Sequence, residues 1–283
     1  MNRVLITGGS GSFGQAMARH LLDTTDVASV CIFSRGEHRQ AEMRDKFNND
    51  ERLRFFIGDT RDQDRLRRAM EGVDVVLHAA ALKRIEVGVY CADEMVKTNV
   101  IGAMNVVAAA HDAKVKTVVA LSTDKAWGGG VSPYGQTKAL AESIFLQANN
   151  SSPATKFSAV RYGNIWNSNG SVVPRWRAMI SAGATEVPVT DPDCTRFFML
   201  IGEAVQLVLD TVSNDKAAQL AIPELMPSYR IGDLAEAMGV KMRVVGLPVW
   251  ERKHEGLRDG LTSDIVRKLT VNELREYLND AAP

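Results

Sequence analysis

The chain has 283 residues, a length that favours one large domain with a smaller lobe. Apolar residues make up 45% and charged residues 24%, which is ordinary for a soluble globular protein, and basic and acidic residues balance at 34 each. This balance gives no sign of nucleic-acid binding or of an anionic membrane surface, and no run approaches the ~20 apolar residues of a membrane helix.

The cysteines and the N-terminus point to a reducing compartment. Cys31, Cys91 and Cys194 are widely spaced and form no pattern such as C-x-x-C, so we expect structural thiols and no metal site. The N-terminus leads directly into a predicted strand and a glycine loop, without the layout of a signal peptide. We therefore expect a cytoplasmic protein.

Strands and helices alternate through the first half of the chain. Apolar runs of strand length occur at Arg3–Thr7, Ser29–Ser34, Leu53–Ile57, Val73–His78 and Val115–Leu121. Helical stretches separate them at Ser12–Asp23, Glu37–Phe47, Gln63–Met70 and Asp93–Ala113. Several runs, such as VLIT and DVVLHA, are continuously apolar, which is typical of strands covered on both faces. The pattern predicts an α/β fold with a Rossmann-type doubly wound parallel sheet.

The alternation continues briefly and then loosens. A helix at Tyr134–Asn149 and a strand at Lys156–Arg161 are followed by short elements separated by prolines, and Val271–Leu278 forms a last helix. We expect residues 1–162 to form the Rossmann domain, with later segments able to complete it. Residues 163–283 should mainly form a smaller lobe that binds substrate.

A glycine-rich segment follows the first strand and opens the first helix. Gly8, Gly11 and Gly14 give the spacing G-x-x-G-x-x-G, with Ser10, Ser12 and Phe13 between them. Glycines let the chain turn tightly and bring backbone N–H groups and a helix N-terminus close to a pyrophosphate. The strand–turn–helix context predicts a dinucleotide site, although a glycine turn without a ligand is the simpler alternative.

The end of the second strand indicates which dinucleotide binds. NAD-binding proteins usually place Asp or Glu there, whereas this chain has Ser34 and Arg35, with Arg39 one helical turn further on. A hydroxyl and two guanidinium groups suit a 2′-phosphate, so NADP is predicted over NAD. Solvated arginines are the alternative. Asp59 after the third strand and the small residues Ala79, Ala80 and Ala81 after the fourth lie where such sheets bind ligands.

Strand five ends in Ser122-Thr123-Asp124-Lys125, and Tyr134 and Lys138 follow on a predicted helix. The last two residues are four apart, so they share one helix face. A neighbouring ammonium favours the phenolate form of a tyrosine, whose ordinary pKa near 10 makes it a poor base. In this context Tyr134 and Lys138 predict a catalytic pair rather than an exposed helix pair.

The chain resembles the extended short-chain dehydrogenases/reductases, and within them the inverting UDP-N-acetylglucosamine 4,6-dehydratases of pseudaminic acid and capsule sugar biosynthesis. The matching segments are ITGGSGSFG, IFSRGEHRQAEM, RFFIGDTRD, VLHAAALKR, KTNVIGAMNV, ALSTDKA, YGQTK, VRYGN, GSVVPRW, TRFFM and, loosely, ERKHE. The Asp-Lys pair of ALSTDKA is the specific part, because ordinary sugar epimerases of this superfamily lack it. The likeness also implies cofactor contacts at Thr60 and Asn99 and a homo-oligomer.

The resemblance implies a dehydration driven by an internal redox cycle. Tyr134 takes the C4 hydroxyl proton while hydride passes to NADP, and the resulting ketone acidifies C5. Lys125 is the expected base at C5, a protonated Asp124 donates to the departing C6 hydroxyl, and Thr123 bonds a sugar oxygen. Protonation of the opposite face of C5 inverts that centre. The alternative for Asp124 and Lys125 is a surface ion pair.

The resemblance further implies the UDP-sugar contacts. They are Lys83, Asn164, Ser171, Val172, Arg196 for the diphosphate, and Glu255 near the uridine. Arg196 could equally form a structural ion pair.

Two departures from the family pattern leave alternatives open. The loop after Lys125 contains a glycine triplet, Gly128–Gly130, and Val249-Trp250 stands where relatives have Pro-Gly. The rival activities are a nucleotide-sugar 4-epimerase and a 5,6-dehydratase, and a rival of another class is a non-catalytic NADP-sensing protein.

Overall fold

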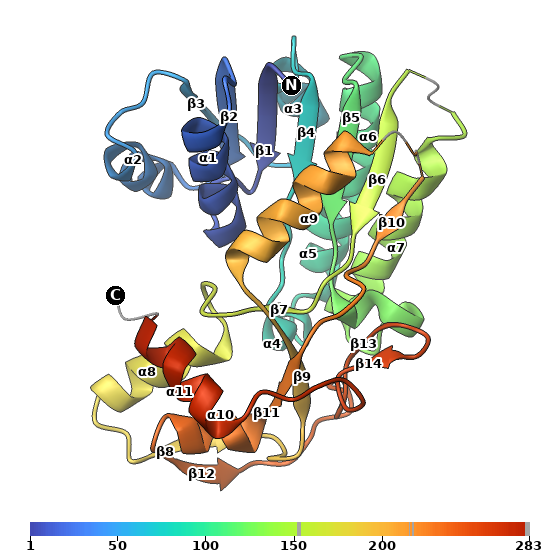
Figure 1. The fold of residues 1–283 in the computed structure, drawn as a ribbon. Coiled ribbons are helices and arrows are strands. Elements are labelled where there is room, and N and C mark those ends of the chain that lie inside the picture. Colours follow the sequence, from blue (N-terminus) through green and yellow to red (C-terminus); the bar gives the residue numbers. More distant parts are fainter. Residues whose placement is uncertain (152–153, 215, 217, 281–283) are drawn as a thin grey trace.

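The computed structural model describes residues 1–151, 154–214, 216 and 218–280. A larger part built around a sheet stands above a smaller part made of short helices and strands (Figure 1). Within these described residues, no helix combines the length and the apolar character that crossing a membrane would require.

A seven-stranded parallel sheet forms the centre of the larger part. Its strands run in the order β10-β6-β5-β4-β1-β2-β3, and every neighbouring pair is parallel. The strands are β1 (Arg3–Thr7), β2 (Ser29–Ser34), β3 (Leu53–Ile57), β4 (Val75–His78), β5 (Thr117–Leu121), β6 (Lys156–Val160) and β10 (Leu220–Ala221). This order confirms the predicted Rossmann-type doubly wound sheet.

Helices cover both faces of this sheet. One face is covered by α1 (Ser12–Thr24), α2 (Glu37–Lys46) and α9 (Ile201–Ser213), and the other by α3 (Gln63–Ala69), α6 (Gly102–Asp112) and α7 (Pro133–Ala148). Strand β1 shows why its sequence is continuously apolar. Val4 and Ile6 belong to the core under α1 and α9, whereas Leu5 belongs to the core under α3 and α6.

One predicted helix is more complex in the structure. The stretch predicted as a single α-helix at Asp93–Ala113 consists of α5 (Ala92–Met95), the π-helical segment η1 (Val96–Ile101) and α6. A π-helical turn shifts the directions in which its side chains point, but it has no apolar periodicity of its own. An analysis of sequence periodicity therefore predicts one continuous α-helix here. Two further short helices, α4 (Ile85–Gly88) and the 3₁₀ segment η2 (Asp124–Gly129), lie in the loops after β4 and β5.

The smaller part has its own core and three small sheets, ordered β11-β9-β7, β12-β8 and β13-β14. Aromatic rings of Trp166, Phe198, Tyr229 and Tyr277 pack together in this core. Its elements are β7 (Asn164–Ile165), α8 (Val172–Ser181), β8 (Glu186–Val189), β9 (Thr195–Met199), β11 (Ser228–Arg230), α10 (Ile231–Ala237), β12 (Lys241–Val244), β13 (Gly256–Arg258), β14 (Leu261–Thr262) and α11 (Val271–Asp280).

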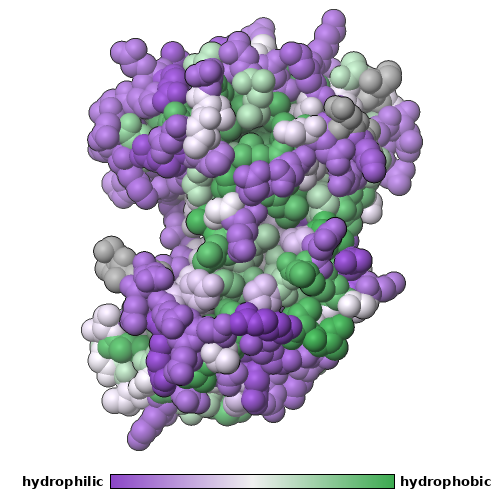
Figure 2. Space-filling model, in the orientation of Figure 1, coloured by the Kyte–Doolittle hydropathy of each residue, from purple (hydrophilic) through white to green (hydrophobic). Residues whose placement is uncertain are grey.

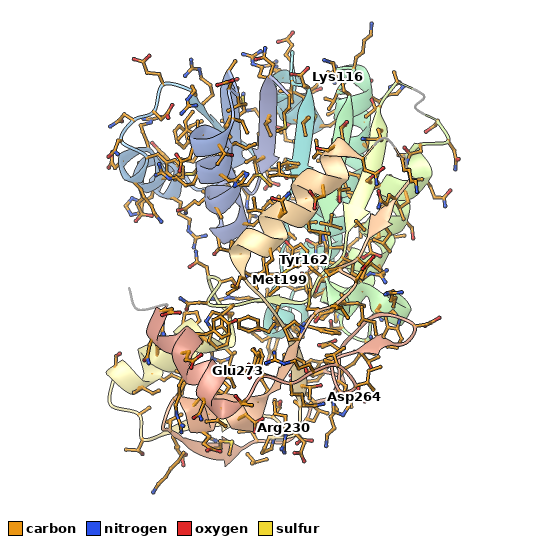
Figure 3. The ribbon with its side chains drawn as sticks, in the orientation of Figure 1. Lys116, Tyr162, Met199, Arg230, Asp264 and Glu273 are labelled. Carbon is orange, nitrogen blue, oxygen red and sulfur yellow. The ribbon has the colours of Figure 1, made fainter. Side chains whose placement is uncertain are left out.

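The two parts meet below the carboxyl ends of the sheet strands. Figure 3 shows Tyr162 and Met199 at this junction, and both residues are buried. The chain crosses the junction more than once, because α9 and β10 return from the smaller part to the large sheet. Figure 2 shows mainly hydrophilic outer surfaces and a hollow at the left edge, between the region of α1 and α2 and the region of α8 and α11.

Candidate active site

The glycine segment after β1 makes a close turn against the end of β4. Gly8 has φ +67°, and a Cβ added there would lie 2.8 Å from the backbone nitrogen of Ala80. A Cβ on Gly14 would lie 2.3 Å from the carbonyl oxygen of Gly9. No side chain caps α1, and its first turn carries no acidic residue. A narrow backbone cradle below a free helix N-terminus fits the pyrophosphate of a dinucleotide.

The other residues of the glycine segment tie it to its surroundings. The Ser10 hydroxyl donates to the Ser34 hydroxyl at 3.1 Å, across to the end of β2. Ser12 Oγ accepts from the backbone nitrogen of Asn169 at 3.0 Å, which joins the segment to the smaller part. Phe13 is buried in the core. The loop is therefore held in place on three sides before any ligand binds.

The end of β2 presents two exposed cations beside an ordered hydroxyl. Arg35 and Arg39 are exposed, and Arg35 Nη1 lies 3.9 Å from Asp59 Oδ2. Gln40, which sequence reasoning missed, is buried and donates to the hydroxyl and carbonyl oxygens of Ser34 at 2.9 and 3.1 Å. The sequence offers only one signal for this contact, which is the spacing of six residues between Ser34 and Gln40.

The loops after β3 and β4 complete this edge of the sheet. Burial acts to raise the pKa of Asp59, but hydrogen bonds from Arg61 outweigh it and the pKa lies below its ordinary value. Thr60 is buried, and its carbonyl accepts from Asn105 at 3.0 Å. After β4, Ala79, Ala80 and Ala81 are partly buried, with Ala80 against the Gly8 turn.

Asn99 lies in the π-helical segment η1 and holds the loop that carries Lys83. Its side chain accepts from the Leu82 nitrogen at 2.8 Å and donates to the Leu82 carbonyl and the Thr137 hydroxyl, each at 3.0 Å. Lys83 is exposed, and partial desolvation together with the charges of Arg84 and Lys125 lowers its pKa. The π turn therefore fixes the loop that carries Lys83, close to the predicted catalytic helix α7.

Thr123, Asp124 and Lys125 follow β5 and form a connected group. Asp124 Oδ1 accepts from the Thr123 hydroxyl at 2.8 Å and from Lys125 Nζ at 3.1 Å. Asp124 Oδ2 is buried and has no hydrogen-bond partner in the described structure. Burial raises the pKa of Asp124, and the charge of Lys125 opposes this without reversing it. An unpaired oxygen on a carboxyl that tends to keep its proton can donate that proton.

Tyr134 and Lys138 project from the first turns of α7. Ser132 caps this helix by accepting from the Gly135 nitrogen at 3.1 Å, and Pro133 occupies the first turn, so the Ser-Pro pair is a start signal that sequence reasoning overlooked. Burial raises the pKa of Tyr134 to about 12, against the effects of Lys125 and Thr123. Burial lowers the pKa of Lys138 to about 8. Lys138 Nζ donates to the Leu121 carbonyl at 2.6 Å.

The proposed substrate residues divide into two groups. Asn164 on β7 and Ser171 at the start of α8 each have a buried side-chain oxygen without a partner among the described residues, and Val172 follows them. Such oxygens can receive a ligand. The guanidinium of Arg196 instead contacts the carboxylate of Glu251 and two carbonyl groups of the chain.

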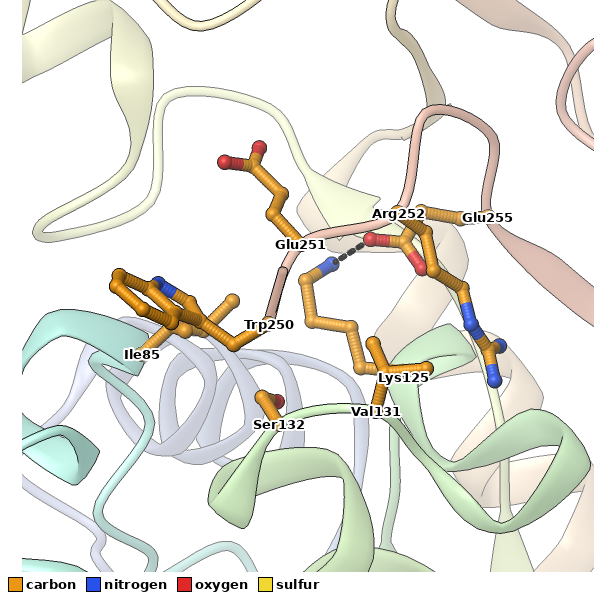
Figure 4. Close-up of a pocket in the computed structure, with 8 residues that line it drawn as sticks. All are labelled: Ile85, Lys125, Val131, Ser132, Trp250, Glu251, Arg252 and Glu255. Atoms are coloured by element: carbon orange, nitrogen blue, oxygen red, sulfur yellow. Dashed lines mark ion pairs between the residues drawn. The ribbon is translucent and has the colours of Figure 1, made fainter. Parts of the chain in front are cut away.

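Glu255 lies beside the group formed by Thr123, Asp124 and Lys125. It is buried, and Glu255 Oε1 is 3.3 Å from Lys125 Nζ (Figure 4). The two residues line a small pocket together with Ile85, Val131, Ser132, Trp250, Glu251 and Arg252. The described part of the chain contains no group of three His, Cys, Asp or Glu side chains that could hold a metal ion.

The chain is similar in sequence to known proteins over most of its length. The family model described as polysaccharide biosynthesis protein matches residues 4–268. The chain is 41% identical over 256 residues to a UDP-N-acetylglucosamine 4,6-dehydratase (inverting) of Campylobacter jejuni, a match that covers 89% of this chain and 76% of that protein. It is 36% identical over 285 residues to a UDP-glucose 4-epimerase of Rickettsia massiliae, covering 97% and 81% of the two chains.

The solved structures show the same fold. Pen from Bacillus thuringiensis superposes with a TM-score of 0.92 at 30% identity, covering 99% of this chain and 97% of that one. DesIV, a dTDP-glucose 4,6-dehydratase from Streptomyces venezuelae crystallised with NAD, has a TM-score of 0.78 at 22% identity, covering 97% and 90% of the two chains. The chain therefore belongs to the polysaccharide biosynthesis protein family, within the extended short-chain dehydrogenases/reductases.

Proposed function

We propose that this chain is an NADP-dependent dehydratase that converts UDP-N-acetylglucosamine to a 4-keto-6-deoxy sugar with inversion at C5. The relative from Campylobacter jejuni carries a name of this kind. The glycine cradle, Ser34, Arg35 and Arg39 would hold the dinucleotide. The chemistry supplied by a bound nicotinamide would be hydride transfer, from C4 in the oxidation and back to C6 after the loss of water.

The observation that carries the proposal is the arrangement of Asp124 and Lys125 at the end of β5. Removing water from C5 and C6 needs a base at one carbon and an acid at the other. Lys125 Nζ and Asp124 Oδ1 lie 3.1 Å apart, so the two groups reach adjacent atoms of one ligand. Lys125 rests as an ammonium and takes the C5 proton only after it has lost its own proton, and Asp124 gives its proton from the unpaired Oδ2 to the departing C6 hydroxyl.

Tyr134 serves the first step, removal of the C4 hydroxyl proton. The phenolate is disfavoured by burial, so it needs positive charge nearby. Lys125 provides one such charge, and Lys138 lies one helical turn further along α7. Asn164, Ser171 and Lys83 would contact the nucleotide sugar from the neighbouring loops.

The proposal is tested by incubating the purified protein with UDP-N-acetylglucosamine in D₂O and following the sugar by proton NMR. We expect loss of the H5 signal and a new C6 methyl signal, with coupling constants that report an inverted C5. A UDP-N-acetylgalactosamine product would instead show a 4-epimerase, the activity named for the Rickettsia relative. An exocyclic alkene signal would show a 5,6-dehydratase. An unchanged sugar, even with added NADP, would contradict the proposal.

Two variants separate dehydration from oxidation at C4. Asp124→Asn and Lys125→Gln should stop methyl formation while C4 oxidation, seen as absorbance of the reduced nicotinamide, continues. Lys116→Gln is a suitable control, because Lys116 is exposed and Figure 3 places it at the end of the sheet away from the site. Equal loss of both signals in all three variants would show a general defect.

A further inference from the structure

Glu255 shares the Lys125 ammonium with Asp124. Lys125 Nζ is 3.1 Å from Asp124 Oδ1 and 3.3 Å from Glu255 Oε1, and the side chains of the two acids are 1% and 3% exposed. Figure 4 shows the Lys125–Glu255 pair at the wall of the pocket. The second oxygen of each carboxyl, Asp124 Oδ2 and Glu255 Oε2, has no partner among the described residues. Two buried carboxyls therefore share one ammonium.

The segment that carries Glu255 is held rigidly. The backbone nitrogen of Glu255 donates to Ser263 Oγ at 2.9 Å, and its carbonyl accepts from the Ser263 nitrogen at 2.8 Å. Gly256 packs so closely on Trp127 that an added Cβ would lie 2.4 Å from the ring. The Leu257 carbonyl accepts from Arg161 at 2.8 Å. These contacts come from three separate parts of the chain, so the fold fixes the backbone that carries Glu255.

The charges around Lys125 favour a proton on one of the two neighbouring carboxyl groups, Asp124 or Glu255. Arg196 is ion-paired with Glu251, and its charge also acts on Glu255 and Lys125. Three carboxylates, those of Asp124, Glu251 and Glu255, therefore stand against two cations, Lys125 and Arg196. Lys83 in the loop after β4, Tyr134 on α7 and Tyr229 on β11 each interact electrostatically with Lys125. Two carboxylates beside one ammonium carry a net negative charge in a buried site, which favours protonation of one carboxyl. Burial and the charge of Glu255 both raise the pKa of Asp124.

We propose that Glu255 is a positioning residue for dehydration, which holds the Lys125 ammonium so that Asp124 retains the proton it must donate. The inference rests on the proposed dehydratase function and deepens it. Glu255 does not touch the reacting atoms in this role; it acts through Lys125 and Asp124. It was expected near the uridine of the substrate, a role that would act on substrate affinity instead.

The first test reads Lys125 directly and needs no turnover. Lysine labelled with ¹³C at Cε is incorporated, and the Lys125 signal is assigned as the one missing from Lys125→Gln. In the wild-type protein the signal should titrate above the ordinary lysine value of about 10.4. In Glu255→Gln the midpoint should fall by about 1 pH unit or more, because one of the two carboxylates is gone. Glu255→Asp keeps the charge and should stay closer to the wild type.

Glu251→Gln is the matched control, because it removes a carboxylate from the same segment that pairs with Arg196 rather than with Lys125. Its effect on the Lys125 midpoint should be smaller than that of Glu255→Gln. An unchanged midpoint in Glu255→Gln would overturn the inference. If that variant does not fold, the wild-type titration still decides, since a Lys125 midpoint below about 10.4 would contradict it.

The second test uses the pH dependence of turnover. Losing the Glu255 charge lowers the pKa of both Asp124 and Lys125, so both limbs of the kcat profile should move to lower pH while KM changes little. A raised KM with an unmoved profile would make Glu255 a substrate contact and overturn the inference. Absence of any dehydratase activity in the wild type would refute the proposed function alone, because the lysine titration stands independently of it.

Discussion

Lys138 carries its ammonium in the interior of the protein, and this has a consequence for stability. Burial lowers its pKa to about 8 from an ordinary 10.5, with Glu142 acting in the opposite direction. A lysine whose pKa is lower in the folded than in the unfolded protein destabilises the folded protein. The destabilisation is greatest below the folded-state pKa, where the lysine is charged in both the folded and the unfolded protein. The penalty disappears as pH rises from about 8 to 10.5, where the lysine is neutral in both states.

We therefore expect the free energy of unfolding of the cofactor-free protein to rise by about 2–3 kcal/mol over this range, relative to Lys138→Met. Urea unfolding at a series of pH values measures the difference, and the methionine variant removes contributions from other titrating groups. A difference that stays constant with pH would show that Lys138 is solvated in the folded protein.

The two exposed arginines after β2 should govern the choice of dinucleotide. A hydrogen bond to a charged group contributes about 1.5–3 kcal/mol, so Arg35→Ala or Arg39→Ala should weaken NADP binding by roughly 10- to 100-fold. NAD, which lacks the 2′-phosphate, should bind with little change. Arg44→Ala is the control on the same helix, because Arg44 packs over the Phe55 ring. Calorimetric titration with both dinucleotides would contradict NADP specificity if the two affinities fell together.

At the scale of elements, apolar runs in the sequence predicted the strands of the large sheet well. They did not predict the π-helical turn or the short strands of the smaller part. The bounds of β1, β2 and β3 match the prediction. For β1 and β2 the reason is that a strand covered on both faces must be apolar almost throughout, whereas β3 is an edge strand that is only partly buried. The π turn that holds Asn99 has no period of its own to detect. Short strands such as β7 and β12 depend on partners far along the chain, so their own sequence carries little signal.

In the candidate site, too, local motifs could be predicted from sequence whereas contacts between distant residues could not. The places of Tyr134, Lys138 and the glycines in the fold could be predicted, because each motif lies within one strand–turn–helix unit. The Lys125–Glu255 pair joins residues more than a hundred positions apart, and the Arg161 contacts to Glu142 and Leu257 also cross elements. Such pairings are set by the packing of the smaller part on the sheet, which no local pattern records.

The glycine triplet before α7 offers a test at the element scale. Gly129 and Gly130 both have positive φ, +80° and +76°. An added Cβ at Gly129 meets nothing within 4 Å, whereas one at Gly130 would lie 2.4 Å from the Gln136 nitrogen. Gly129→Ala should cost about 1–2 kcal/mol of stability for the backbone conformation alone. Gly130→Ala should cost about 1–3 kcal/mol more, because the start of α7 must move.

Chemical unfolding of the two alanine variants measures this difference, to which the backbone of Gly130 (φ +76°, ψ +152°), a conformation nearly restricted to glycine, also contributes. Because Tyr134 lies on the first turn of α7, Gly130→Ala should also reduce kcat more than Gly129→Ala. Equal stabilities would mean that the loop adjusts without moving the helix.

At the scale of the whole molecule, Arg161 joins the two parts through the interior. Its Nε donates to Glu142 on α7 at 2.9 Å, and its Nη1 donates to the Leu257 carbonyl on β13 at 2.8 Å. The side chains of Arg161 and Glu142 are only 13% and 6% exposed. One guanidinium thus connects the helix of Tyr134 and Lys138 to the strand that follows Glu255.

Removing one partner of this pair should be costly, because the other charge stays buried without compensation. Arg161→Gln should lower the free energy of unfolding by about 3–5 kcal/mol. The double variant Arg161→Gln with Glu142→Gln removes both charges, so its loss should be smaller than the sum of the two single losses by about 0.5–3 kcal/mol. A double-mutant cycle in urea measures this coupling. Losses that simply add would show that the two side chains do not interact in solution.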